Sequence, residues 1–159
     1  MNIFYRVDNR LVHGQIISTW MPHLRVKTFV IVNDDVPGNE LRTTMFRMAI
    51  PPEHKLLVLS IDDAAQWLNA HRHSTESILV LIESIDDAVR LFQAGHPFPQ
   101  LNIGNVHHAP GRRSFTPAVY LSDDDLDALR GLQQRGLRAE IQSLPTETPM
   151  DMQRALEAT

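Results

Sequence analysis

The chain has 159 residues, a formal net charge of −4 and no cysteine, and 43% of its residues are hydrophobic. This length and composition are typical of one globular domain with a full core, so we expect a single domain over residues 1–159. The negative charge argues against a nucleic-acid surface, and the absence of cysteine excludes disulfides and thiolate metal sites. With no signal-peptide pattern and no apolar run approaching the roughly 18 residues that span a bilayer, we expect a cytoplasmic protein.

A charged segment joins the first predicted strand, residues 3–5, to the first predicted helix, residues 16–21. His13 stands just before this helix, where backbone N–H groups converge, and neutral imidazole is a good nucleophile near pH 7. Arg10 can offer a guanidinium fork to phosphoryl oxygens, and the amides of Gly14 and Gln15 begin an anion-binding helix end. Asp8 could hold Arg10 or orient the imidazole. The alternatives are a capping or packed histidine and a surface ion pair.

Three continuous apolar runs follow, at residues 29–32, 56–59 and 78–82. Continuous runs of this length predict strands that are covered on both faces of a parallel sheet. Helical spacing lies between them, so the order is βαβα and the fold class is α/β. Ser60, Ser84 and Ser122 each precede a predicted helix and have aspartate three residues later, which is typical of helix caps rather than of a phosphate site.

The C-terminal half continues the alternation less regularly. Residues 101–104 predict a short strand that runs into a long loop at 105–116, and residues 118–121 predict another strand. A helix at 125–134 should end near Gly136, followed by a last strand at 138–142 and a short helix around 152–156.

Ligands in an open α/β sheet bind beyond the carboxyl ends of the strands. His13, Asp34 and Gly104 all follow predicted strands, so we expect their loops to share one edge of the molecule. Arg112 lies in the loop after Gly104 and could contact phosphate or an acidic partner. The alternatives are an acid-capped turn for Asp34 and a solvated basic loop for Arg112.

The segment 6–15 resembles the active-site segment of the IIB components of the mannose/fructose/sorbose family of the bacterial phosphoenolpyruvate-dependent sugar phosphotransferase system (PTS). The resemblance extends over nearly the whole chain, through the segments RVDNRLVHGQ (6–15), TW (19–20), IVNDD (31–35), AIP (49–51), LNIG (101–104) and VYLS (119–122), residues 132–136 and Pro145. One departure is visible, because Asn105 and Val106 stand where many relatives have glycine and methionine.

This resemblance implies an open, mostly parallel, twisted sheet of about seven strands with helices on both faces. It implies that His13 is the phosphohistidine intermediate: Nδ1 accepts a phosphoryl group from the IIA component and passes it to a sugar translocated by the membrane components IIC and IID. The protein would then be associated with the inner face of the membrane through IIC and IID, and would use no metal or diffusible cofactor. The residues predicted for the site are His13, Arg10 and Asp8 as catalytic, Gly14, Gln15 and Arg10 as phosphate-binding, and Arg6, Asp34, Gly104, Asn105 and Arg112 as accessory.

Other function classes lack their sequence signals. The histidines show no metal-ligand spacing, and the motifs of nucleotide-binding loops and serine hydrolases are absent from the sequence. Two alternatives remain open. A regulatory protein could report PTS flux through phosphorylated His13 without sugar transport, and an α/β domain could bind a small molecule at the same strand ends. The sequence leaves the sugar and homodimer formation undetermined.

Overall fold

The computed structural model describes residues 2–157, and within this range seven strands form one open sheet that is parallel except at one edge. This confirms the predicted α/β class and the mostly parallel sheet. The neighbouring strands, in spatial order, are β3 (Lys55–Leu59), β2 (Thr28–Val32), β4 (Ile78–Ile82), β1 (Ile3–Asp8), β5 (Gln100–Asn105), β8 (Arg138–Ile141) and β9 (Met150–Asp151). Only β9 pairs antiparallel to its neighbour in this sheet, where it contacts β8.

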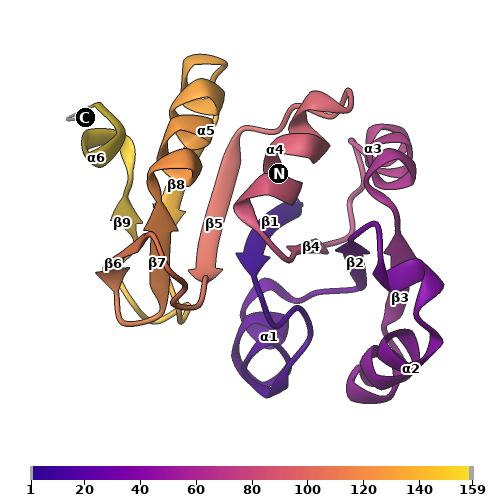
Figure 1. Cartoon of the computed structure of the whole chain (residues 1–159). Helices are drawn as coiled ribbons and strands as arrows, with labels where there is room; N and C mark the ends of the chain where they lie inside the picture. Colours follow the sequence, from indigo (N-terminus) through magenta and orange to yellow (C-terminus); the bar gives the residue numbers. More distant parts are fainter. Residues whose placement is uncertain (1, 158–159) are drawn as a thin grey trace.

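Helices cover both faces of the sheet (Figure 1). A π-helix, η1 (Ile16–Trp20), continues into α1 (Met21–Leu24), and a short turn, η2 (Val36–Gly38), precedes α2. The other helices are α2 (Glu40–Ala49), α3 (Ile61–Ala70), α4 (Ile85–Gln93), α5 (Asp123–Gln134) and α6 (Gln153–Glu157). The three predicted serine caps are confirmed, because the hydroxyls of Ser60, Ser84 and Ser122 accept hydrogen bonds from the backbone N–H three residues later.

Two apolar clusters lie on opposite faces of the sheet. One joins the sheet to α3, α4, α5 and α6, and the other joins it to η1, α1 and α2. β2 and β4 are buried along their whole length, as their continuous apolar runs predict. The same expectation is wrong for β3, which is only half-buried because it forms the edge of the sheet and has a neighbour on one side only.

The prediction of a long loop at residues 105–116 is also wrong in part. Its second half forms β6 (Arg112–Thr116), which pairs antiparallel with β7 (Val119–Ser122) in a separate two-stranded sheet. Sequence periodicity missed β6 because four of its five side chains are polar and none of the five is buried, so they follow no apolar pattern.

The order of the strands creates a switch point between β1 and β5. The chain leaves β1 toward β2 on one side and leaves β5 toward β8 on the other, so the loops after these two neighbouring parallel strands diverge. In open α/β sheets such a crevice is the usual place of a ligand site. In Figure 1 the arrowheads of β1 and β5 point to the end where α1 lies. Within residues 2–157, no helix combines the length and the apolar character needed to cross a membrane.

A buried polar cluster lies apart from this edge. The Tyr5 hydroxyl is 2.5 Å from Nε2 of His96, and Nδ1 of His96 is 2.7 Å from Oδ1 of Asn69. An amide oxygen only accepts hydrogen bonds, so Nδ1 carries the proton and Nε2 accepts from the tyrosine. Burial, assisted by the charge of Arg72, lowers the pKa of His96 to about 4, and burial raises the pKa of the Tyr5 hydroxyl.

This depressed pKa predicts a pH-dependent loss of stability. Between pH about 6.5 and about 4 the unfolded chain binds a proton at His96 that the folded chain does not. The free energy of unfolding therefore decreases as the pH decreases, by roughly 3 kcal/mol over this window. Urea unfolding across this window should show a weaker pH dependence for His96→Gln, whose amide can still accept from Tyr5. Equal pH slopes in the two proteins would contradict the assignment.

Candidate functional site

The loop that carries His13 begins where β1 ends. The Asp8 carbonyl accepts from the N–H of Leu11 at 2.9 Å, and the Asp8 side chain accepts from the N–H of Arg10 at 3.0 Å, which closes a tight turn. Leu11 is fully buried with φ of 57°, a left-handed conformation that costs a non-glycine residue about 1–2 kcal/mol. The His13 carbonyl then accepts from the N–H of Ile17 at 3.2 Å. His13 is therefore held at the start of a helix by a strained and well-anchored turn.

His13 and Asp8 form the central contact of this loop. Nε2 of His13 lies 2.9 Å from Oδ2 of Asp8, whose side chain is fully buried, whereas the His13 side chain is 15% exposed. Burial alone would raise the pKa of Asp8, but hydrogen bonds from His13 and Arg10 outweigh it, so the pKa lies below its ordinary value. An ionised carboxylate only accepts, so Nε2 carries the proton and the lone pair lies on Nδ1, which makes no hydrogen bond to any of residues 2–157.

Arg10 and Gln15 close one side of the same cluster. Arg10 is half-exposed, and its guanidinium donates from Nε to Oδ1 of Asp8 at 3.2 Å and from Nη2 to Oε1 of Gln15 at 3.4 Å. Gly14 is exposed, and a side chain at this position would meet no atom within 4 Å. Since the first intrahelical bond is donated by Ile17, the N–H groups of residues 14–16 have no partner within the helix. This end of the helix can bind an anion.

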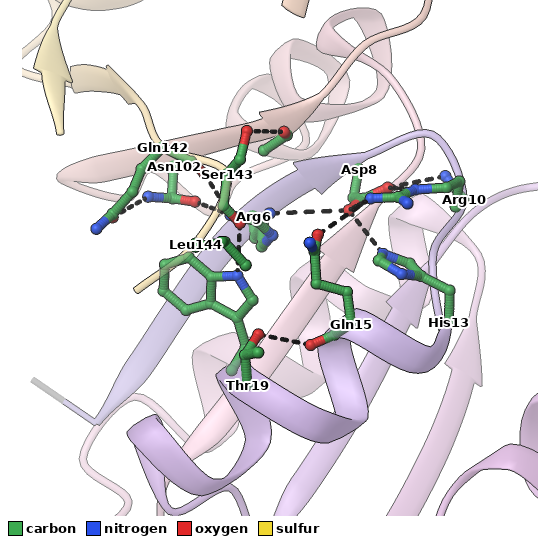
Figure 2. Close-up of polar contacts among 12 residues, drawn as sticks. Arg6, Asp8, Arg10, His13, Gln15, Thr19, Asn102, Gln142, Ser143 and Leu144 are labelled. Carbon is green, nitrogen blue, oxygen red and sulfur yellow. Dashed lines mark hydrogen bonds and ion pairs between the residues drawn. The ribbon is translucent and has the colours of Figure 1, made fainter. Parts of the chain in front are cut away.

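Arg6 lies on the other side of Asp8 and is fully buried (Figure 2). Its Nη2 atom is 3.8 Å from Oδ2 of Asp8, and its guanidinium donates to the carbonyls of Gln142 at 2.8 Å and Ser143 at 3.0 Å. It also donates to the Asn102 side chain and stacks on the Trp20 ring at 4.5 Å. Burial lowers the pKa of Arg6 to about 10, so the side chain stays charged at neutral pH.

Two of the predicted accessory residues lie directly beneath the loop. β1 pairs with β5 so that Val7 opposes Ile103 and Asp8 opposes Asn105, which leaves Gly104 as the extra residue of a β-bulge. The Asn105 carbonyl accepts from the N–H of Asn9 at 3.0 Å. Gly104 and Asn105 therefore support the His13 turn through backbone geometry.

The other two accessory residues have their contacts elsewhere. Asp34 accepts from the N–H of Ile61 at 3.0 Å and pairs with Arg90 at 2.5 Å, which matches the acid-capped turn considered above. Arg112, at the start of β6, donates to the carbonyl of His107 in the loop between β5 and β6 at 2.9 Å. The described residues contain no cluster of three or more histidine, aspartate or glutamate side chains arranged to hold a metal ion.

Sequence reasoning missed several members of the site. Asn102, Ser143 and Trp20 surround Arg6, and the Trp20 indole N–H donates to the Ser143 carbonyl at 3.0 Å. Asn102 offered a signal, since it is a polar residue between Leu101 and Ile103 in the predicted strand, and the structure buries it to 2% exposure. Ser143 gave none, because it contributes a backbone carbonyl that any residue could supply.

The sequence is similar to those of several known proteins. The family model described as "PTS system sorbose subfamily IIB component" matches residues 2–159. The fructose-specific EIIB component of the PTS of Bacillus subtilis is 29% identical over 152 residues, which cover 95% of this chain and 93% of that protein. The mannose-specific EIIAB component of Escherichia coli is 25% identical over 147 residues, which cover 92% of this chain and 46% of that protein.

The fold agrees with a solved structure of the same kind. The crystal structure of the IIBSor domain of the sorbose permease from Klebsiella pneumoniae matches with a TM-score of 0.87 and 29% sequence identity, and the match covers 100% of this chain and 98% of that chain. The family model, the sequence relatives and the solved structure therefore each match nearly the whole chain. The chain belongs to the sorbose subfamily of PTS system IIB components.

Proposed function

We propose that His13 is the phosphorylated residue of this IIB component and that it takes the phosphoryl group on Nδ1. PTS IIB components act as phosphotransferase components, which supports a role in sugar phosphotransfer. The observation that carries the proposal is the 2.9 Å contact between Nε2 of His13 and the buried carboxylate of Asp8. This contact leaves the Nδ1 lone pair available and balances the positive charge that the ring gains when Nδ1 bonds to phosphorus.

The surroundings of His13 support the same role. Phosphoryl transfer depends mainly on positioning and on charge stabilisation, because the transferred group carries its negative charge on three oxygens. The N–H groups at residues 14–16 and the half-exposed guanidinium of Arg10 are donors at the start of the helix. Arg10, Gly14 and Gln15 thus form the phosphate-binding set that we propose, and Asp8 orients the ring of His13.

The proposed reaction has two transfers. In the first, the Nδ1 lone pair of His13 attacks the phosphorus of a phosphohistidine on the IIA component, and the old P–N bond breaks with its electron pair returning to the donor ring. In the second, a hydroxyl of a sugar held by IIC and IID attacks the phosphorus, the P–Nδ1 bond breaks with its electron pair returning to the His13 ring, and the hydroxyl proton passes to water. The name of the Escherichia coli relative, EIIAB, joins an A and a B component in one protein, which supports IIA as the donor. We place the protein at the inner face of the membrane, docked on IIC and IID.

Arg10 provides a test of the phosphate-binding set. Arg10→Met should lower the rate of phosphorylation by phosphorylated IIA by about 10²-fold, because a donor to the transferred oxygens is lost. The free energy of unfolding should change by less than about 1 kcal/mol, since the Arg10 side chain is 42% exposed and Asp8 keeps its contacts with His13 and Arg6. Rapid-quench kinetics and urea unfolding measure the two effects, with Arg10→Lys as the control that keeps the charge but loses the fork. A wild-type rate in Arg10→Met would remove Arg10 from the set.

The direct test of the proposed function is labelling by a phosphorylated donor. The protein is incubated with IIA, the general PTS proteins and phosphoenolpyruvate, and peptides are analysed by mass spectrometry under conditions that preserve phosphohistidine. We expect one phosphoryl group on the peptide that contains His13. A protein that binds to phosphorylated IIA but stays unlabelled, or is labelled at another histidine, would contradict the proposal.

A further inference from the structure

Arg6 is a charged side chain placed where a β-strand normally carries an apolar one. It lies in the central strand, none of its surface is exposed, and burying an unpaired guanidinium would cost several kcal/mol. The chain offsets this cost with carbonyl groups from two residues of the segment after β8, with an amide from β5 and with the face of an indole. An apolar residue would fill this space without any of these partners, so the fixed charge itself must serve a purpose.

The charge of Arg6 is directed at Asp8. The two residues are separated by one position on β1, so their side chains emerge on the same face of the sheet. Oδ2 of Asp8 is 3.8 Å from Nη2 of Arg6 and 2.9 Å from Nε2 of His13, so one carboxylate oxygen lies between the buried cation and the histidine. Figure 2 shows Asp8 placed between these two side chains. A buried cation at this distance favours the ionised carboxylate, which can only accept the proton of Nε2.

We propose that Arg6 is a positioning residue for His13: acting through Asp8, it holds the imidazole in the tautomer whose lone pair is on Nδ1. This inference rests on the function proposed for His13 and adds to it a residue that does not touch the phosphoryl group. The Ser143 carbonyl accepts hydrogen bonds from both Arg6 and Trp20, so the segment after β8 helps to hold Arg6 in place.

The guanidinium of Arg6 occupies space that is free only because residue 104 is glycine. A Cβ atom on Gly104 would overlap the guanidinium of Arg6, with Cζ and Nη2 as the nearest atoms. Gly104 has no positive φ, so the need for glycine here is steric and not conformational. Any side chain at this position would displace the guanidinium from its place beside Asp8. Substitution at Gly104 is therefore a second way to disturb Arg6, without changing Arg6 itself.

The tautomer of His13 gives a readout that needs no phosphoryl donor. Long-range ¹H–¹⁵N NMR at alkaline pH, where imidazole is neutral, distinguishes the Nε2–H form from the Nδ1–H form. We expect Nε2–H to dominate in the wild type and in Arg90→Met, a control that removes an exposed arginine. In Arg6→Met the two forms should mix, and the rate of phosphorylation by phosphorylated IIA should fall on the order of 10²-fold, as expected for a displaced reacting group. Arg6→Lys should retain part of the preference for the Nε2–H tautomer and part of the phosphorylation rate.

Gly104→Ala completes the test. In the wild-type background it should shift the tautomer and lower the phosphorylation rate. In the Arg6→Met background its effect on stability should shrink, because the methyl group enters the space that the guanidinium leaves. An unchanged tautomer and an unchanged rate in folded Arg6→Met overturn the proposal. If that variant does not fold, the same two unchanged values in Arg6→Lys and Gly104→Ala overturn it. A wild type that shows the Nε2–H tautomer but takes no label contradicts the proposed function alone.

Discussion

Replacement of His13 by alanine should abolish phosphoryl uptake from phosphorylated IIA while the protein stays folded. The side chain is the only nucleophile in the proposed mechanism, so no slower route to the same peptide remains. Among residues 2–157 the side chain of His13 makes one hydrogen bond, 2.9 Å to Asp8, and losing one costs about 1–3 kcal/mol when the partner stays buried. Intact-protein mass spectrometry measures the uptake, and circular dichroism with thermal unfolding measures the fold.

His108→Ala is the matched control for this experiment. His108 belongs to the loop that follows β5, and its ring packs edge-on against Tyr120 with 5.3 Å between the ring centroids. This variant should be phosphorylated at the wild-type rate, since the proposed mechanism does not use His108. Stable labelling of His13→Ala, or loss of labelling in His108→Ala, would contradict the assignment of the phosphorylated residue.

Asp8→Asn should have the second largest effect, lowering the phosphorylation rate by about 10³- to 10⁴-fold. An asparagine can present its NH₂ group to Nε2, which favours the tautomer that carries the proton on Nδ1, and it removes the negative charge that balances the phosphorylated ring. A comparable replacement in a histidine–aspartate pair of serine proteases lowers turnover by about 10⁴-fold. Single-turnover kinetics with phosphorylated IIA measure the rate.

The same substitution should also reduce stability. Asp8 is the buried anion opposite Arg6, and removing one partner of a buried pair costs about 3–5 kcal/mol. Urea unfolding separates this loss from the kinetic effect, because the rate is measured where the variant is still folded. Arg10→Met, which removes the other cation of Asp8, should be nearly as stable as the wild type. An Asp8→Asn variant that is phosphorylated within tenfold of the wild-type rate would rule out the proposed role of the carboxylate, since tenfold corresponds to only about 1.4 kcal/mol.

The parts of the fold that could be predicted from the sequence are those governed by local chemistry. Continuous apolar runs identified β2 and β4, because strands buried on both faces have no polar side to show. Serine with aspartate three residues later identified the starts of α3, α4 and α5, since capping is decided within one helical turn. The position of His13 at a helix start followed from the same kind of local pattern.

The parts that could not be predicted depend on strands that are distant in sequence. Arg6 was one of several accessory candidates, and its burial follows from the meeting of β1, β5 and the segment after β8. The bulge at Gly104 is a register shift between two strands, which no single segment encodes. β3 carries the same kind of apolar run as its neighbours but lies at the sheet edge. Local pattern thus found most of the helices and strands and the candidate histidine, whereas the order of the strands determined which polar residues surround it.

The most direct test of the central claim is to identify which ring nitrogen carries the phosphoryl group. The protein is labelled with ¹⁵N at histidine and phosphorylated by IIA, and ³¹P–¹⁵N coupling then assigns the bonded nitrogen of His13. The 2.9 Å contact between Nε2 and Asp8 predicts a bond to Nδ1, with Nε2 still protonated. A phosphoryl group on Nε2 would contradict the account, because that nitrogen must keep its proton for Asp8 to hold the ring.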